Sequence, residues 1–90
     1  MNHNNRIIRI EAARTNAELL HATDGYHEHI LAAHPALRVT HGFNVAMRAR
    51  RYLCALNDVK RAARGRGDRY GDVIRVLECA SQKQFALEES

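Results

Sequence analysis

The chain has 90 residues, 46% of them hydrophobic, and a net charge of +4, which suits one small domain over residues 1–90 with a modest core. No apolar run is long enough to cross a membrane, and residues 1–5 lack the apolar segment of a secretory signal. We therefore expect a cytoplasmic protein that does not bind membranes. Two cysteines, Cys54 and Cys79, are too few for a disulfide scaffold in so short a chain, and we expect reduced thiols.

The first predicted element covers residues 5–22. Apolar side chains recur there at spacings of three and four, at Ile10, Ala13, Ala17 and Leu20. This spacing predicts a helix. The β-branched residues near the start leave a short strand over residues 6–10 as the alternative.

A turn and a short second helix follow. Asp24-Gly25 predicts the turn, and the helix covers Tyr26 to His34. Pro35 ends it, because proline disfavours helical geometry in the preceding residue. Residues 35–42 are predicted to be a loop or a brief extended piece.

The third helix, over residues 43–64, is the longest predicted element. At about 100° per residue, one side of this helix carries an apolar stripe. The stripe consists of Val45, Ala49, Tyr52, Leu56, Val59 and Ala63. The opposite side carries a basic ridge of Arg50, Asn57, Arg61 and Arg64, with Phe43, Met47 and Cys54 close to it.

Gly65 is placed to end this helix in a left-handed conformation, and a fourth helix is predicted over residues 69–86. The ends of the chain, residues 1–5 and 87–90, are expected to be frayed. The predicted fold is all-α: a small irregular bundle of three to four helices with the third helix as its axis. Leu56 and Leu77 are expected to be buried where the two long helices pack.

Positive charge is concentrated between residues 48 and 69. This stretch holds eight of the 14 Lys and Arg residues against two acids, so the rest of the chain is slightly acidic. Concentrated positive charge attracts phosphates or acidic protein surfaces, and the forked guanidinium group suits both. The predicted partner-binding residues are Arg48, Arg50, Arg51, Asn57, Lys60, Arg61, Arg64, Arg66 and Arg69.

Three histidines, His27, His29 and His34, are weak candidates for a metal site because imidazole binds zinc and nickel. The spacing of two between His27 and His29 splits them across a helix, and no His-Glu-x-x-His pattern is present. We expect neither a metal nor another cofactor, and a His-cluster metal-binding protein is kept as a minor alternative.

An enzyme is not expected. Neither cysteine is predicted at a helix N-terminus that would lower its pKa, and no pair of carboxylates suggests acid–base chemistry. Sequence-specific DNA reading is also disfavoured, since no helix-turn-helix pattern with a clear recognition helix is present.

The sequence therefore predicts a small non-catalytic regulator or inhibitor. It would dock on a larger protein or nucleoprotein complex through its Arg-rich helix face, against acidic residues or in place of a nucleic acid. A phage or mobile-element protein would fit this size and this lack of catalytic motifs. The alternative is direct, mainly nonspecific binding of DNA or RNA. Self-association into a homodimer is left open.

Overall fold

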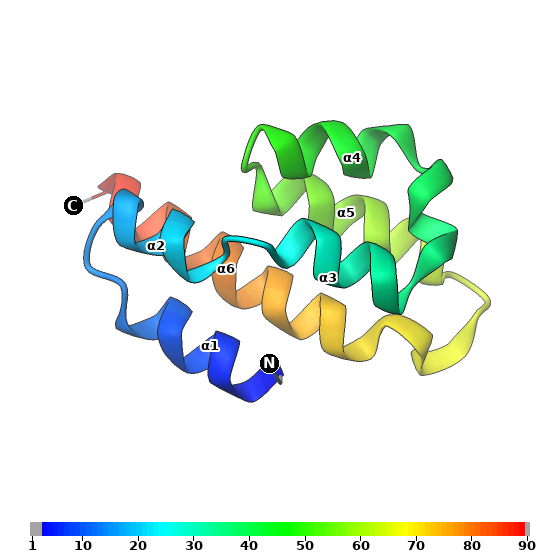
Figure 1. Cartoon of the computed structure of the whole chain (residues 1–90), viewed down its shortest axis with the longest axis horizontal. Helices are drawn as coiled ribbons and strands as arrows, with labels where there is room; N and C mark the ends of the chain where they lie inside the picture. The colour runs from blue at the N-terminus through cyan, green and yellow to red at the C-terminus, as the bar shows by residue number, and fades with distance from the viewer. Residues whose placement is uncertain (1–2, 90) are drawn as a thin grey trace.

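The computed structural model describes the backbone of residues 3–89 and the side chains of residues 4–66 and 69–89. The prediction of an all-α fold is confirmed, since these residues form six α-helices and two short 3₁₀ helices and no strand (Figure 1). The elements are α1 (His3–Ala12), α2 (Asn16–Ala22), α3 (Tyr26–Ala33), η1 (Pro35–Val39), α4 (His41–Arg48), α5 (Tyr52–Ala63), η2 (Gly67–Tyr70) and α6 (Gly71–Glu89). None of these described helices combines the length and the apolar character needed to cross a membrane.

The axis of the bundle is α6, the longest helix, with 19 residues. It packs against α1 and α2 on one side and α5 on the other, and α4 covers α5 from outside (Figure 1). Its buried stripe at spacings of three and four consists of Val73, Val76, Leu77 and Ala80. The predicted axis, residues 43–64, was wrong, because that segment is not one helix.

A left-handed residue divides the segment 43–64 into α4 and α5. Arg50 has φ 56°, and its N–H donates to the carbonyl of Met47 at 3.1 Å. The next N–H, of Arg51, donates to the carbonyl of Ala46 at 2.8 Å. These two bonds are the Schellman pattern that ends helices, here with arginine where glycine is usual. An L-residue in this conformation costs roughly 1–2 kcal/mol.

Two tertiary contacts hold this turn. The Arg50 guanidinium lies 3.5 Å from the Asp24 carboxylate, in the turn between α2 and α3. The Arg50 carbonyl accepts a hydrogen bond of 3.2 Å from Nε2 of Gln84 on α6. The turn is therefore tied to two other parts of the bundle, which offsets the cost of its backbone conformation.

The break changes which side chains face the core. Phe43 and Met47, predicted near the polar ridge, are buried, whereas Val45 is 50% exposed and Ala49 is exposed. In α5 the side predicted to be apolar does face the core, because the buried residues of this helix are Tyr52, Ala55, Leu56 and Val59. The apolar stripe predicted across the whole segment therefore holds only after the break.

The first predicted helix is also two helices. Thr15 occupies the N-cap of α2, where its hydroxyl accepts the N–H of Glu18 at 3.1 Å. The Glu18 carboxylate in turn accepts the N–H of Arg14. This reciprocal pattern resembles a capping box and starts a new helix. Residues 6–10 lie within α1, so the strand alternative is excluded.

Other predicted boundaries lie close to the observed ones. The turn at Gly25 and the end of α5 at Gly65 both use left-handed glycine, with φ values of 75° and 79°. The segment from Pro35, predicted as a loop, forms η1. Residues 3–5 and 87–89, expected to be frayed, are helical, and residues 1, 2 and 90 lie outside the described part.

A buried arginine ties α1 to the middle of the chain. The Arg6 side chain donates to the carbonyl of Ala22 at 3.3 Å, and its guanidinium lies 4.8 Å from the centre of the Tyr26 ring. Burial lowers the pKa of Arg6 below its ordinary value and raises the pKa of Tyr26. A buried cation over an aromatic face contributes about 2 kcal/mol when desolvated. This contact fixes α1 against the start of α3.

Substitutions at Arg50 test the turn between α4 and α5. Arg50→Gly and Arg50→Ala both remove the contact with Asp24, so the difference between them reports the backbone alone. In a left-handed turn the glycine variant is more stable by about 1 kcal/mol. In an uninterrupted helix the alanine variant is more stable by about the same amount. Urea unfolding measures the difference, and a more stable alanine variant contradicts the turn.

Substitution of Leu77 tests the core between α5 and α6. Leu77 is fully buried, as predicted, and Leu77→Ala is expected to lower the free energy of unfolding by roughly 2–5 kcal/mol. The matched control is Phe85→Ala on the same helix, where the ring is 64% exposed, with an expected change within about 0.5 kcal/mol. Equal losses in thermal or urea unfolding would show that the buried face of α6 is assigned incorrectly.

Candidate partner-binding site

An open groove lies between α4 and the outer face of α5. Three of the predicted partner-binding residues line it, Arg51, Asn57 and Arg61. The groove has a volume of about 410 Å³ and is open to solvent along one side. Both arginines are exposed, so the groove has positive charge near each end of its α5 wall.

Apolar side chains lie between these charges. Val45, half exposed, forms part of the α4 wall, and the exposed Cys54 lies on the α5 wall. Leu53, beside Cys54 on α5, is 58% exposed. This combination of exposed apolar centre and charged margin is typical of protein interfaces and is unusual for a purely solvated helix face.

One acid lies inside the groove. Asp58 is half-buried, and its carboxylate occupies the space beside Gly42 where a Cβ atom would stand, since Oδ2 would be 2.6 Å from that atom. Gly42 lies in the first turn of α4, where free backbone N–H groups favour negative charge. The Asp58 carboxylate therefore lies against the start of α4.

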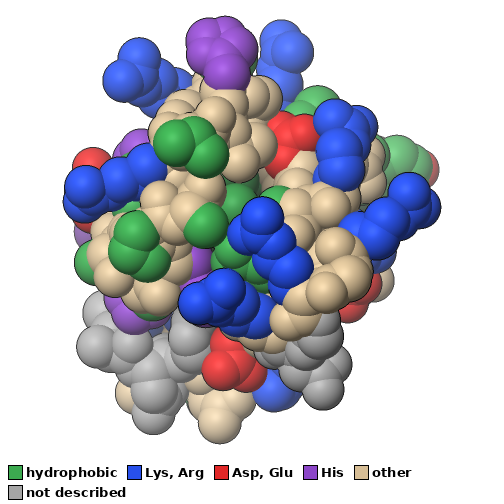
Figure 2. All heavy atoms as spheres, turned by 90° about the vertical axis from the view of Figure 1, so that its right-hand side faces the viewer, with side chains coloured by type: hydrophobic (Ala, Val, Ile, Leu, Met, Phe, Trp, Pro, Cys, Tyr) green, Lys and Arg blue, Asp and Glu red, His purple; other side chains and the backbone are tan. Residues whose placement is uncertain are grey.

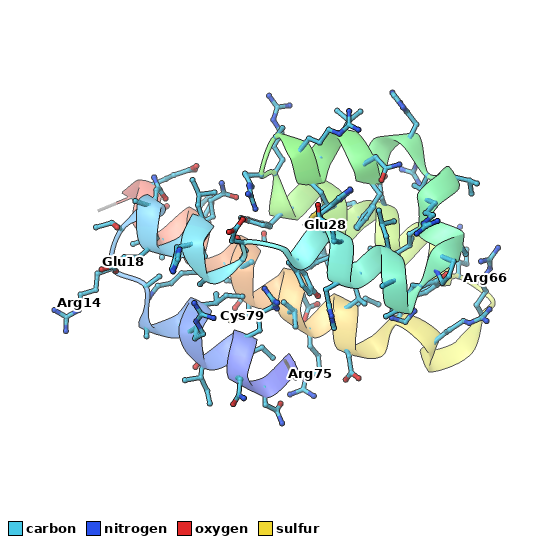
Figure 3. All side chains as sticks on the ribbon, viewed as in Figure 1. Arg14, Glu18, Glu28, Arg66, Arg75 and Cys79 are labelled. Atoms are coloured by element: carbon cyan, nitrogen blue, oxygen red, sulfur yellow. The ribbon has the colours of Figure 1, made fainter. Side chains whose placement is uncertain are left out.

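The basic surface continues past the end of α5. Arg64, Arg66 and Arg69 are exposed there, next to η1, which carries Arg38 and the 88% exposed Val39. Figure 2 looks onto this end of the molecule and shows Lys and Arg side chains projecting over much of it. Arg66 projects from the same end in Figure 3.

The remaining predicted residues lie elsewhere or are already engaged. Arg48 and Arg50 lie beside the turn at Asp24 and do not line the groove. Lys60 forms an ion pair of 3.4 Å with Glu78 on α6. The ridge predicted along one continuous helix is therefore divided by the break at Arg50, and its α5 half forms the groove wall.

Within the described part of the chain, the arginines of the groove and of the basic end differ from Arg50 and Lys60 in having no acidic partner. Among the described side chains, none forms an ion pair with Arg51, Arg61, Arg64, Arg66 or Arg69. Arg48 and Arg38 are likewise outside the ion pairs of the described residues. These guanidinium groups retain their full capacity for an external acid or phosphate.

Four of the five aromatic side chains are buried. The three tyrosines and Phe43 are buried, and the exposed Phe85 lies on α6, whose C-terminal part is far from the basic end in Figure 1. Flat exposed rings are the usual platform for stacking bases of single-stranded nucleic acids. The basic surface has no such platform among the described residues.

The three candidate metal ligands each lie against a different ring. His27 stacks on Phe43, His29 on Tyr26, and His34 lies 5.0 Å from the ring centre of Tyr70. The described residues contain no group of three His, Cys, Asp or Glu side chains placed to hold one metal ion. The histidines instead contribute to packing around α3.

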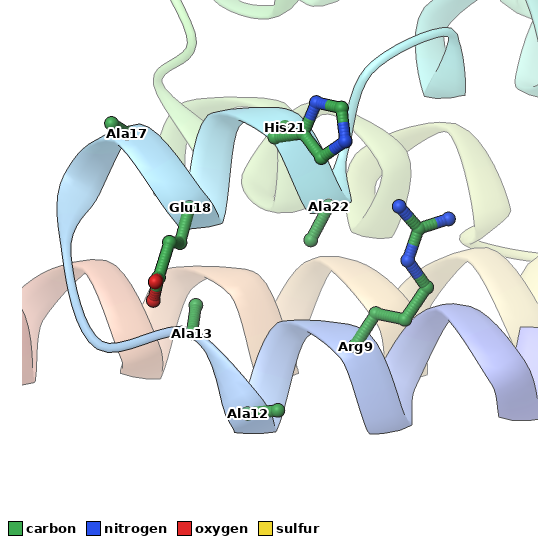
Figure 4. Close-up of a pocket in the computed structure, with 7 residues that line it drawn as sticks. All are labelled: Arg9, Ala12, Ala13, Ala17, Glu18, His21 and Ala22. Carbon is green, nitrogen blue, oxygen red and sulfur yellow. The ribbon is translucent and has the colours of Figure 1, made fainter.

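A second hollow lies between α1 and α2 (Figure 4). Its surface is largely alanine, and its polar side chains are those of Arg9, Glu18 and His21. This hollow carries less positive charge than the α4–α5 groove, and none of the predicted partner-binding residues lines it.

Sequence reasoning missed the contributions of His41, Val45 and Asp58 to the groove. Val45 was assigned to the buried stripe because no residue in the stretch Ala49-Arg50-Arg51 predicts a helix end. The glycine at position 42 is a sequence signal for the close approach of another side chain to α4, and the predicted position of Cys54 near the ridge agrees with its place on the groove wall.

Searches against protein-family models, curated proteins and solved structures find no match to this chain. The fold and the groove are therefore the basis for any functional proposal.

The two cysteines provide a test of the groove. Cys54 is exposed, whereas burial, with a smaller contribution from Glu11, raises the pKa of the Cys79 thiol. Because the thiolate is the reactive form, a maleimide at pH 7 should modify Cys54 first and Cys79 more slowly. Cys54→Ser should remove the fast phase, as followed by mass spectrometry. Equal rates at the two positions would contradict the exposure of Cys54.

Proposed function

We propose that this protein is a small non-catalytic regulator or inhibitor that docks on a larger protein or nucleoprotein partner. The docking surface comprises the α4–α5 groove and the basic end beyond it. The observation that carries the proposal is that the arginines on both sides of exposed Val45 and Cys54 have no acidic partner among the described side chains. Arginine next to exposed apolar surface is enriched where proteins bind one another.

The partner would offer acidic side chains, or the phosphates of a nucleic acid that it holds. In the second case the arginines of this protein would cover that nucleic acid. A role of this kind suits a phage or mobile-element protein acting in the cytoplasm. Neither cysteine forms a disulfide, in keeping with that compartment.

Direct, mainly nonspecific DNA or RNA binding is the second candidate. The exposed Arg64, Arg66 and Arg69 at one end of the molecule favour it, because phosphate contacts dominate nonspecific affinity. The Asp58 carboxylate in the groove and the buried tyrosines support a protein partner instead.

Charge reversal in the groove tests the proposal. The tagged protein is purified from its own cell type after nuclease treatment, alongside the double variant Arg51→Glu/Arg61→Glu. A bound protein should be retained by the unaltered chain and lost from the variant, because both substitutions place like charges against an acidic partner. Quantitative mass spectrometry compares the two samples.

The control is Arg14→Glu/Arg75→Glu, which changes the net charge by the same amount on exposed side chains outside the groove (Figure 3). It should retain the partner. Circular dichroism checks that both double variants remain helical, since surface substitutions usually change stability by less than about 0.5 kcal/mol. Equal losses in the two double variants would contradict the groove as the docking surface.

Salt dependence separates the two candidate functions. Direct binding of a duplex should weaken steeply between 50 mM and 200 mM salt, by roughly 10³-fold if six phosphates are contacted. Docking on a protein through an apolar centre should weaken far less. Fluorescence anisotropy with a random-sequence duplex, and with the captured partner, measures both slopes. Tight, steeply salt-dependent duplex binding would favour the second candidate.

A further inference from the structure

The α4–α5 groove has the dimensions of a short helix. The residues that line its α5 wall run from Arg51 to Arg61, which corresponds to about 15 Å along the helix axis. A helix of about ten residues, close to three turns, has the same length. Helix-in-groove binding places apolar residues of the ligand, at spacings of three and four, against an apolar floor.

The chemistry of the groove defines the ligand further. Val45 and Ala46 from α4 and Cys54 from α5 provide an apolar centre. Arg51 and Arg61 lie near opposite ends of the α5 wall, with no acidic partner among the described side chains. A complementary helix therefore has one apolar stripe flanked by carboxylates. Charge complementarity of this kind fixes orientation and excludes wrong partners.

Asp58 distinguishes such a helix from a nucleic acid. Each strand of a duplex carries one phosphate per about 3.4 Å of helix axis, so a duplex against the groove would place several phosphates near the Asp58 carboxylate, which repels them. A protein helix can instead place a hydroxyl, an amide or a lysine opposite this carboxylate. The groove therefore favours a ligand that has carboxylates near Arg51 and Arg61 and an uncharged or positively charged group opposite Asp58.

We propose that the α4–α5 groove binds an acidic, amphipathic α-helix of the partner protein. This inference rests on the proposed function and specifies how its partner is recognised. The apolar stripe of the helix packs on Val45 and Cys54, and its carboxylates pair with Arg51 and Arg61.

The test is a selection from a displayed library of random peptides of about 15 residues, long enough to span the groove as a helix. Selection uses the intact protein, with Val45→Asp as the counter-target. Val45 is half exposed, so the substitution keeps the fold while placing an acid against an acidic ligand. The enriched peptides should be acidic, with apolar residues at spacings of three and four.

Individual enriched peptides are then synthesised and their affinities measured by fluorescence anisotropy. Val45→Asp should weaken binding about tenfold or more, and the control Ile8→Asp, on α1 outside the groove and 62% exposed, should weaken it less than about twofold. Scrambled peptides of the same composition should bind at least about tenfold more weakly, because they keep the charge and lose the apolar stripe.

Three results overturn the proposal: enrichment of peptides that are not acidic or lack the helical spacing, equal effects of Val45→Asp and Ile8→Asp, or equal binding of scrambled peptides. The peptide selection can fail while a partner protein is still captured after nuclease treatment. In that case the proposed function stands, and something other than an acidic helix occupies the groove. Capture that disappears with nuclease, or that survives Arg51→Glu/Arg61→Glu, would instead contradict the proposed function itself.

Discussion

Arg50 adopts a left-handed backbone conformation in the middle of a segment whose composition otherwise favours an uninterrupted helix. The Asp24 carboxylate and the Gln84 side-chain amide hold it there, each from a different part of the bundle. If the segment continued as one helix, α4 could not fold back over α5. The buried positions of Phe43 and Met47, the exposure of Val45 and the groove itself all depend on this one turn.

The same turn separates the basic residues by role. Before it, Arg48 faces the turn between α2 and α3, and Arg50 is used internally. After it, α5 packs one face on α6 and turns the other outward, where its arginines have no acidic partner among the described side chains. Unpaired arginine on a folded surface contributes little to stability, since even paired surface charges are worth about 0–1 kcal/mol. These arginines are therefore available to an external ligand, as the proposed docking requires.

Much of the fold could be predicted from composition and periodicity. The all-α class, the short helix before Pro35, the glycine that ends α5 and the burial of Leu77 follow from local rules with strong signals. The two missed breaks differ in kind. Thr15 carries a capping-box signal that was present in the sequence, whereas Arg50 has no local signal, because its conformation is stabilised by residues far away in the chain. The charge of the site was therefore predictable and its groove was not, since the groove depends on that second break.

Site-specific photo-crosslinking in living cells tests the central claim, that a partner protein occupies the α4–α5 groove, most directly. A photoreactive amino acid at Asn57, on the α5 wall, is compared with one at Gln82, exposed on α6 outside the groove. The account predicts a protein crosslink at position 57 that mapping assigns to an acidic helix, and little crosslinking at position 82. Crosslinks to nucleic acid at position 57, or equal protein crosslinking at both positions, would contradict it.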